Sequence, residues 1–149
     1  MPSFSVQTMI DTSPEAAFDL ARDVDAHKRS QAYSKEEVIA GVMTGLLELG
    51  DELTFKATHF GVPFRMTAKI VEFDRPHRFV DEQVSGPFGS MRHEHTFRRD
   101  GDATLMTDTV TFSSPLGPIG RLVDSVFLEK YMRKLIENRG QALKEELEA

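Results

Sequence analysis

Strand-like runs separated by short turns fill the middle of the chain, from about Lys35 to Ser113, and they limit the possible folds more than any other feature. The runs contain β-branched and aromatic residues, and the turns contain glycine, proline or aspartate. These connections are shorter than the dozen residues that a parallel crossover needs, so consecutive strands should pair as antiparallel hairpins. We predict a meander built from EEVIAGV, ELTFKATHF, FRMTAKIVEF, HRFVDEQV, SMRHEHTFRR and ATLMTDTVTFS.

Different patterns precede this meander. Apolar and polar residues alternate from Phe4 to Ile10, which predicts a first strand that ends at Asp11. A helix should begin at Ser13-Pro14, because serine accepts a hydrogen bond from a free N–H group and proline needs no donor there. The polar stretch 23–33 is predicted to be a second short helix or a loop.

The last third of the chain has the period of a helix. Apolar residues recur along one face of it, at Ile119, Leu122, Val123, Val126, Phe127, Tyr131, Leu135, Ile136, Leu143 and Leu147. This spacing predicts a helix of roughly 25 to 30 residues that covers a sheet, with a mild interruption at Gly140. Together the patterns predict an α+β fold in one domain, residues 1–149.

The composition argues against several classes of protein. The net charge is -6 and the charged residues are mixed along the chain, whereas a nucleic-acid surface needs clustered basic residues. There is no cysteine, which excludes disulfides and thiolate chemistry. No apolar run is long enough to span a membrane, and the N-terminus lacks the pattern of a signal peptide. We expect a cytoplasmic protein, monomeric or homodimeric, without stable membrane insertion.

Six short stretches carry a resemblance to a known family. They are Phe60-Gly61-Val62-Pro63, IVEFDRPHRFVDE from Ile70, Gly86-Pro87-Phe88, HEHTF from His93, MTDTV from Met106 and SPLGP from Ser114. Over essentially the whole chain the sequence resembles the bacterial START-like, or SRPBCC, ligand-binding proteins. The resemblance implies a helix-grip fold, in which a curved antiparallel sheet of about seven strands wraps around the long C-terminal helix. It also implies a deep cavity between sheet and helix for hydrophobic small molecules such as lipids, sterols, polyketides or quinones.

Strand alternation indicates which side chains face that cavity. Arginine, lysine, glutamate and threonine occupy the opposite strand faces, which marks those faces as the solvent side. We expect ligand contacts from the inward faces and the long helix, at His59, Phe64, Met66, Phe79, Asp81, Met91, His93, His95, Phe97, Met106, Asp108, Val110, Phe112, Leu122 and Val126. His27 and His77 are expected to be exposed, and the segments 86–89 and 114–120 to lie at the cavity mouth.

The hairpin between the last two strand runs has two possible registers. If Asp100-Gly101 is a two-residue turn, His93 stands opposite Asp108. A loop two residues longer places His95 opposite Asp108 instead. Both registers keep the two histidines and Asp108 on the inward face, whereas a slip by one residue would move them to the other face.

The preceding hairpin brings a second carboxylate to the histidines. Pairing Val84 with Ser90 across the loop sets Asp81 opposite His93 on the inward face. The same pairing sets Glu82 opposite Arg92 on the solvent face. The sequence therefore predicts a buried cluster of Asp81, His93, His95 and Asp108.

Three interpretations of this cluster stay open. The first is a buried polar network in which carboxylates satisfy the imidazoles and give the cavity a polar end that orients a ligand. The second is an acid/base pair, because an aspartate-oriented histidine can transfer protons, and cyclase-like relatives suggest such chemistry on polyketides. The third is a metal site, which is weaker because His-x-His is a short and common pattern. We expect no metal and no cofactor.

These interpretations correspond to different functions. The leading hypothesis is a protein that binds a hydrophobic small molecule in the cavity, and the alternative is a cyclase- or dehydratase-type enzyme that uses pocket histidine and aspartate residues. A partner-binding regulator would need an exposed apolar patch, which sequence cannot show. Whether a reaction is catalysed stays open, because the START-like superfamily includes both carriers and enzymes.

Overall fold

Seven strands form one antiparallel sheet in the computed structural model, which describes residues 2–30, 36–59, 61–113 and 127–149, without the side chain of His59. The strands are β1 (Ser3–Ile10), β2 (Glu37–Gly41), β3 (Glu52–His59), β4 (Val62–Asp74), β5 (Arg78–Ser85), β6 (Ser90–Asp100) and β7 (Ala103–Ser113). Their order across the sheet is β1-β7-β6-β5-β4-β3-β2, so the six later strands form the predicted meander. The first strand pairs with the last, with Ser3 opposite Thr111 and Ile10 opposite Thr104.

Three helices complete the described fold: α1 (Pro14–Ala21), α2 (Val24–Ser30) and α4 (Glu129–Glu148). The side chain of Ser13 accepts a hydrogen bond from the Ala16 N–H at 3.2 Å, which confirms the predicted start of α1. The predicted C-terminal helix is observed as α4 from Glu129, and residues 119–126 of the prediction lie outside the described residues. Among the described helices, none has the length and hydropathy needed to cross a membrane.

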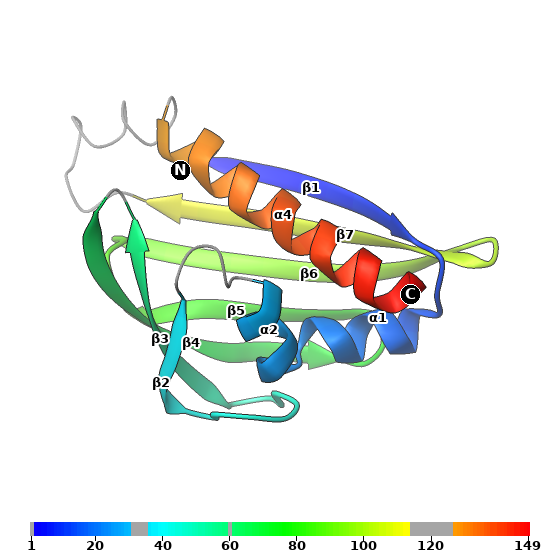
Figure 1. Ribbon diagram of the computed structural model, residues 1–149, viewed down its shortest axis with the longest axis horizontal. Coiled ribbons are helices and arrows are strands. Elements are labelled where there is room, and N and C mark those ends of the chain that lie inside the picture. Colours follow the sequence, from blue (N-terminus) through cyan, green and yellow to red (C-terminus); the bar gives the residue numbers. More distant parts are fainter. Residues whose placement is uncertain (1, 31–35, 60, 114–126) are drawn as a thin grey trace.

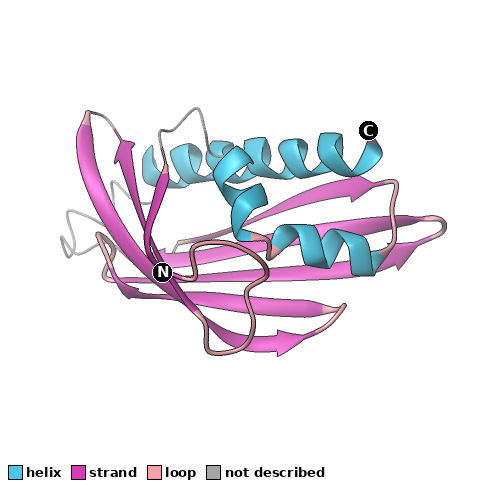
Figure 2. Ribbon diagram, turned by 60° about the horizontal axis from the view of Figure 1, so that its bottom comes forward, coloured by secondary structure: helices cyan, strands magenta, loops and turns pink. Residues whose placement is uncertain are grey.

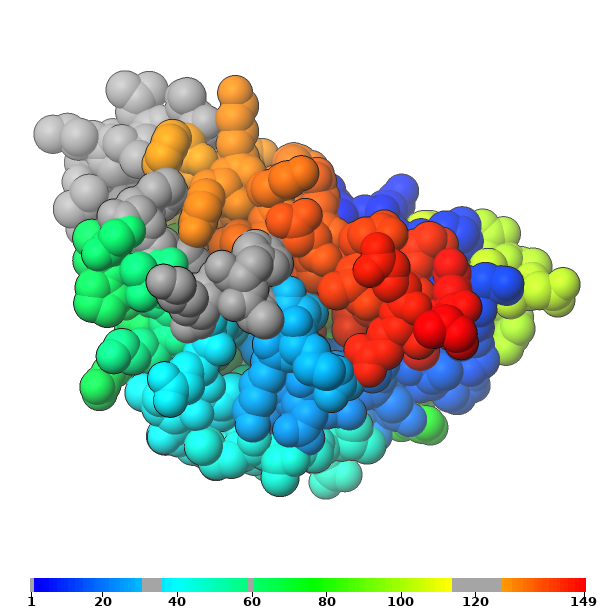
Figure 3. Space-filling view, viewed as in Figure 1, coloured from blue at the N-terminus to red at the C-terminus, as the bar shows by residue number. Residues whose placement is uncertain are grey.

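All three helices lie on the same, concave side of the curved sheet (Figures 1 and 2). Helix α4 crosses that side next to β1, and α1 and α2 lie beside it over the middle strands. In the space-filling view, α4 and the segment formed by α1 and α2 largely hide the sheet behind them (Figure 3). This arrangement is the helix-grip architecture expected from the sequence.

Gly140 allows α4 to approach β1 closely. A Cβ atom at this position would lie 2.6 Å from the Thr8 Oγ1 atom, which is closer than real Cβ contacts. The predicted interruption of the apolar stripe is therefore a contact point between the helix and the sheet.

The buried apolar residues between the sheet and the helices form separate clusters, of which two hold α1 and α4. Phe18 of α1 is fully buried, and its ring meets those of Phe73, Phe79 and Phe97 edge-on at centroid distances of 5.3, 5.2 and 5.3 Å. A second cluster under the first turns of α4 joins Phe4, Val110, Phe112 and Met132. These two clusters hold α1 and α4 on the sheet, so each helix has a defined position over the strands between them.

The observed β6–β7 turn distinguishes the two registers that were predicted for this hairpin. Asp100 pairs with Ala103, so the two turn residues are Gly101-Asp102 and not Asp100-Gly101. Gly101 has a φ of 62°, a conformation that glycine adopts without steric cost at this turn position. Consequently His95, not His93, stands opposite Asp108, as the alternative register predicted.

The β5–β6 hairpin has the predicted register. Asp81 stands opposite His93, and Glu82 stands opposite Arg92. On the solvent face Arg92 forms ion pairs with Glu82 at 3.5 Å and with Glu72 at 2.5 Å. Exposed pairs of this kind contribute little to stability, but they confirm which face meets water.

Candidate functional site

A cavity of about 380 Å³ lies between the sheet and α4. Its volume falls in the range of small-molecule sites in proteins. Apolar side chains from β3, β4, β6, the loop 86–89, α4 and the residue before it form most of the wall, including Phe55, Phe64, Met66, Ala68, Ile70, Pro87, Phe88, Met91, Leu128, Tyr131, Met132, Leu135 and Ile136. Asp81, His93, His95 and Arg139 line the same cavity and supply ionisable groups to it.

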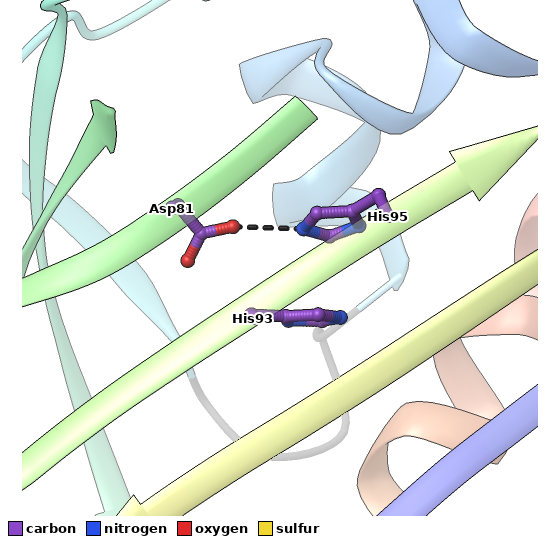
Figure 4. Close-up of side chains that lie close together, drawn as sticks. All are labelled: Asp81, His93 and His95. Carbon is purple, nitrogen blue, oxygen red and sulfur yellow. Dashed lines mark hydrogen bonds and ion pairs between the residues drawn. The ribbon is translucent and has the colours of Figure 1, made fainter. Parts of the chain in front are cut away.

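Three aromatic rings are stacked in the wall of the cavity. The centroids of His93 and His95 are 3.8 Å apart with planes inclined by 20°, and His95 stacks on Phe79 at 4.1 Å and 14°. Both histidines are buried, with 4% and 1% of their surface exposed. The stack arises because His93 and His95 are two residues apart on β6 and therefore project from the same face (Figure 4).

The imidazole of His95 lies between two carboxylates. Its Nε2 atom donates to Asp81 Oδ2 at 2.8 Å, drawn in Figure 4, and its Nδ1 atom lies 3.1 Å from Asp108 Oδ1. His93 Nε2 binds the same Asp108 oxygen at 2.8 Å. Both predicted carboxylates therefore contact the histidine pair, and Asp108 bridges the two rings.

The surroundings give the two histidines opposite pKa shifts. Burial disfavours the charged form of His95, but the hydrogen bonds with Asp108 and Asp81 outweigh burial and raise the pKa of His95. For His93, burial and the adjacent charge of His95 lower the pKa, and the single bond to Asp108 does not compensate. The cluster therefore favours a proton on His95 over a proton on the stacked His93.

The two carboxylates stay ionised in this environment. Burial alone would raise the pKa of Asp108, but its hydrogen bonds to His93 and His95 dominate and lower that pKa strongly. The pKa of Asp81 is also lowered, since the bond to His95 and the charges of His95, His93 and Arg139 together exceed the effect of burial.

Neutral His93 has the arrangement of an oriented base. Its Nε2–H donates to Asp108, so its Nδ1 atom carries the lone pair. Among the described residues Nδ1 has no hydrogen-bond partner, and His93 lines the cavity. This nitrogen can accept a proton or a hydrogen bond from a molecule in the cavity.

Arg139 is one of the ionisable cavity residues that the sequence analysis missed. It is 9% exposed, and its Nη2 atom donates to the Ala21 carbonyl at 2.7 Å. A signal for it exists in the sequence, because Arg139 follows Leu135 and precedes Leu143 by four residues each and so lies on the apolar stripe. A charged residue on such a stripe points into the protein.

Ionisable residues also line the cavity near α2. His27 is only partly exposed, donates through Nε2 to Glu36 and packs near the ring of Phe55, so the expectation that it is exposed was wrong. The reason is that α2 turns this side chain toward β3 instead of toward solvent. His77 is exposed, as predicted.

The predicted ligand contacts fall into three groups. Phe64, Met66, Phe79, Asp81, Met91, His93 and His95 line the cavity. Contrary to the prediction, Phe97, Met106, Asp108, Val110 and Phe112 do not: Asp108 lies behind the histidines, and the other four are packed into the core beneath α1 and α4. His59 by its side chain, and Leu122, Val126 and the segment 114–120 entirely, lie outside the described residues.

Asp81, His93 and His95 also offer a possible set of metal ligands. One ligand atom from each residue lies within 4.8 Å of the others. The Nε2 atoms of both histidines already bind carboxylates, so a metal would have to replace at least one of these hydrogen bonds. The expectation of no metal stays a prediction.

Comparison with protein families gives one match over almost the whole chain. The model described as polyketide cyclase / dehydrase and lipid transport matches residues 1–148. Among curated proteins, none matches the chain.

Solved structures show the same fold over nearly their full lengths. TTHA0849 from Thermus thermophilus is 22% identical with a TM-score of 0.76, and the match covers 98% of this chain and 97% of that one. A START superfamily protein from Mycobacterium smegmatis is 14% identical with a TM-score of 0.73 and the same coverage, 98% and 97%. KanY is 14% identical with a TM-score of 0.77, and coverage is 99% and 98%. At these identities the likeness establishes the fold, which is START-like as predicted.

Proposed function

The chain belongs to the polyketide cyclase / dehydrase and lipid transport family, and from that premise we propose that it binds a hydrophobic small molecule between the sheet and α4. The observation that carries this proposal is the composition of the cavity wall. Apolar side chains from the sheet and from α4 form most of the wall, and the ionisable groups gather at Asp81, His93 and His95 and near α2. Ligand sites commonly have this design, in which apolar surface supplies affinity and a few polar groups supply orientation.

The binding proposal is tested by native mass spectrometry of the purified protein before and after organic extraction. We expect a copurifying apolar molecule that extraction removes, or saturable binding of an environment-sensitive apolar dye by the extracted protein. Ala68→Phe should weaken dye binding, because Ala68 lines the cavity and a phenyl group would occupy it. The matched control is Lys69→Phe, which puts the same ring on the exposed face of β4.

The outcomes separate clearly. Dye binding that Ala68→Phe and Lys69→Phe change equally would show that the dye binds elsewhere. A wild-type protein that neither carries a ligand nor binds any apolar dye would overturn the proposal.

A second candidate function is an acid/base enzyme acting on the same ligand. The observation that favours it is His93, a neutral imidazole held by Asp108 with Nδ1 directed to no described partner. In this reaction His93 would remove a proton from the bound molecule, and the adjacent His95, whose raised pKa favours its charged form, would stabilise the negative charge that develops.

His93→Phe distinguishes the enzyme from the binding protein. Retained ligand affinity with lost conversion of the copurified molecule supports the enzyme, whereas lost affinity without any conversion in the wild type supports binding alone. Glu94→Phe is the control, since Glu94 is the next residue on β6 and faces the solvent side with Arg78.

A further inference from the structure

Two exposed cations on the β3–β4 hairpin have no carboxylate partner. Lys56 of β3 and Arg65 of β4 stand directly opposite each other on the solvent face of the sheet. Like charges in this arrangement repel and destabilise a strand pair. Glu37 stands opposite Lys56 on β2, but neither cation forms an ion pair with it or with any other described carboxylate. The two cations are therefore not placed for the stability of the hairpin.

The first two turns of α4 carry two more cations of this kind. Lys130 and Lys134 are exposed and form no ion pair with a described carboxylate. The β3–β4 hairpin and the start of α4 lie at the same end of the molecule (Figure 1). At the other end, the last turns of α4 contain Glu145, Glu146 and Glu148. A protein with a net charge of -6 thus has unpaired cations concentrated around one end.

Exposed apolar side chains accompany these cations. Val62 at the start of β4 is 49% exposed, Val84 near the end of β5 is 57% exposed, and Phe127 before α4 is exposed as well. Close to them in the chain, the loop 86–89 and Leu128 line the cavity. This end of the molecule therefore combines exposed apolar side chains and unpaired cations with one end of an apolar cavity. Surfaces that bind at a membrane interface combine apolar and basic side chains in this way.

We propose that this end of the protein docks on the surface of an anionic lipid bilayer. Lys56, Arg65, Lys130 and Lys134 contact the headgroup phosphates, and the exposed valines enter the interface between headgroups and acyl chains. Each lysine or arginine near such a surface strengthens binding about fivefold. The association is peripheral and reversible, because the exposed apolar side chains bury too little surface to anchor a protein permanently.

The positions of the cations fit a bilayer better than a protein partner. Lys56 and Arg65 lie on the convex face of the sheet, whereas Lys130 and Lys134 lie on the helix that crosses its concave side. The two pairs therefore flank the end of the molecule from opposite sides. A broad anionic surface that meets this end contacts both pairs at once, since long cationic side chains reach the headgroups while apolar neighbours enter the interface.

Cosedimentation with lipid vesicles tests the proposal, using protein freed of any ligand by organic extraction. Vesicles of phosphatidylcholine alone are compared with vesicles that contain about one third phosphatidylglycerol, an anionic lipid. We expect binding to the anionic vesicles only, and weaker binding as salt screens the charges. Equal binding to both kinds of vesicle, or binding to neither, would overturn the proposal.

Arg65→Glu then identifies the surface. We expect the affinity for anionic vesicles to fall about tenfold or more, because the substitution replaces a cation by an anion and neutralises Lys56 opposite it. The hairpin should not lose stability, since a like-charge pair becomes an opposite-charge pair. The matched control is Arg98→Glu, which makes the same charge change at an exposed, unpaired arginine at the far end of β6. Equal loss in both variants would show that net charge alone controls binding and would overturn the docking surface.

Val84→Ser tests the apolar part of the surface. We expect several-fold weaker binding to anionic vesicles, because serine loses the favourable transfer of the valine side chain out of water. Leu49→Ser is the control, since Leu49 is 62% exposed in the loop between β2 and β3, away from the cations. Equal effects of the two substitutions would contradict insertion at Val84.

This inference and the binding function can fail separately. Extracted protein that binds the apolar dye but no vesicles would overturn the docking surface alone. Extracted protein that binds anionic vesicles but no dye, and from which no apolar molecule was removed, would overturn the ligand-binding function and leave the docking surface standing.

Discussion

The carboxylate of Asp81 accepts a hydrogen bond from His95 at 2.8 Å, although the residue directly opposite Asp81 in the sheet is His93. The contact is diagonal, and it leaves His95 bound by two carboxylates and His93 by one. This difference is the cause of the opposite pKa shifts of the two imidazoles. It also leaves one ring nitrogen of His93 available to the cavity.

Asp108→Asn should destabilise the protein strongly. The substitution keeps the shape of the side chain but removes the negative charge that His93 and His95 share. Removing one partner from a buried charged pair costs about 3 kcal/mol or more. Chemical denaturation at neutral pH measures the effect, with exposed Asp100→Asn in the same hairpin as the control. Equal stability of the two variants would contradict the bridging role of Asp108.

The two histidines should titrate on opposite sides of their ordinary pKa of 6.5. NMR of the imidazole resonances against pH should show His93 losing its proton below this value and His95 above it. His93→Phe and His95→Phe assign the signals. Two titrations with the same midpoint near 6.5 would contradict the asymmetric hydrogen bonding.

The same shifts predict the sign of the pH dependence of stability. The contribution of His95 is complete below pH 6.5 and is lost as pH rises through its raised folded pKa. The contribution of His93 has the opposite sign: it is present above pH 6.5 and is lost as pH falls through its lowered folded pKa. Replacing His93 by Phe should therefore flatten the decline of the unfolding free energy just below pH 6.5, measured by denaturation at several pH values.

Gly140→Ala should destabilise the protein because of Thr8 alone. The added methyl group would lie 2.6 Å from Thr8 Oγ1, and overpacking of this kind costs about 1 to 3 kcal/mol. In a Thr8→Ala background the obstacle is gone, and alanine favours the helix over glycine by about 1 kcal/mol. Thermal unfolding of the two single variants and the double variant should show that Gly140→Ala is harmful only when Thr8 is present. Equal destabilisation in both backgrounds would place the conflict elsewhere.

Gln83→Ala should loosen the wall of the cavity at Phe88. The Gln83 amide donates to the Phe88 carbonyl at 2.8 Å and accepts from the Phe88 N–H at 3.2 Å, so it holds the loop as a strand partner would. Without this clamp, Phe88 should pack less firmly on Phe112, and an apolar dye should enter and leave faster. Stopped-flow dye binding measures the rates, with Glu82→Ala on the opposite strand face as the control. Unchanged rates would show that this loop does not limit ligand exchange.

Much of the fold could be predicted because it depends on local patterns. Short turns force neighbouring strands to be antiparallel, and a period of two residues places His93 and His95 on one face of β6. The hairpin register then adds Asp81 to that face. The turn at Gly101 was misplaced by one residue, since Asp100-Gly101 and Gly101-Asp102 are both acceptable turn pairs. The pairing of Asp100 with Ala103 decides between them.

The candidate site could be predicted only in part, because a side chain on the inward face of the sheet does not necessarily line the cavity. Phe97 and Met106 face the helices as predicted, but α1 with Phe18 fills the space above them. His27 was placed in solvent because a polar local sequence does not show what α2 packs against. Arg139 was missed because its neighbours on the stripe suggested ordinary core packing.

The sequence by itself determined the elements, their antiparallel order and the side of the sheet on which the carboxylates and imidazoles lie, because these depend on residue periodicity and turn length. Only the tertiary structure decided which histidine binds which aspartate, which inward residues meet a cavity, and that Arg139 lies beside it. Those features depend on where α1 and α4 lie over the sheet. That placement results from packing between residues far apart in the sequence, such as Gly140 against Thr8 and Phe18 against Phe97, and no local pattern encodes it.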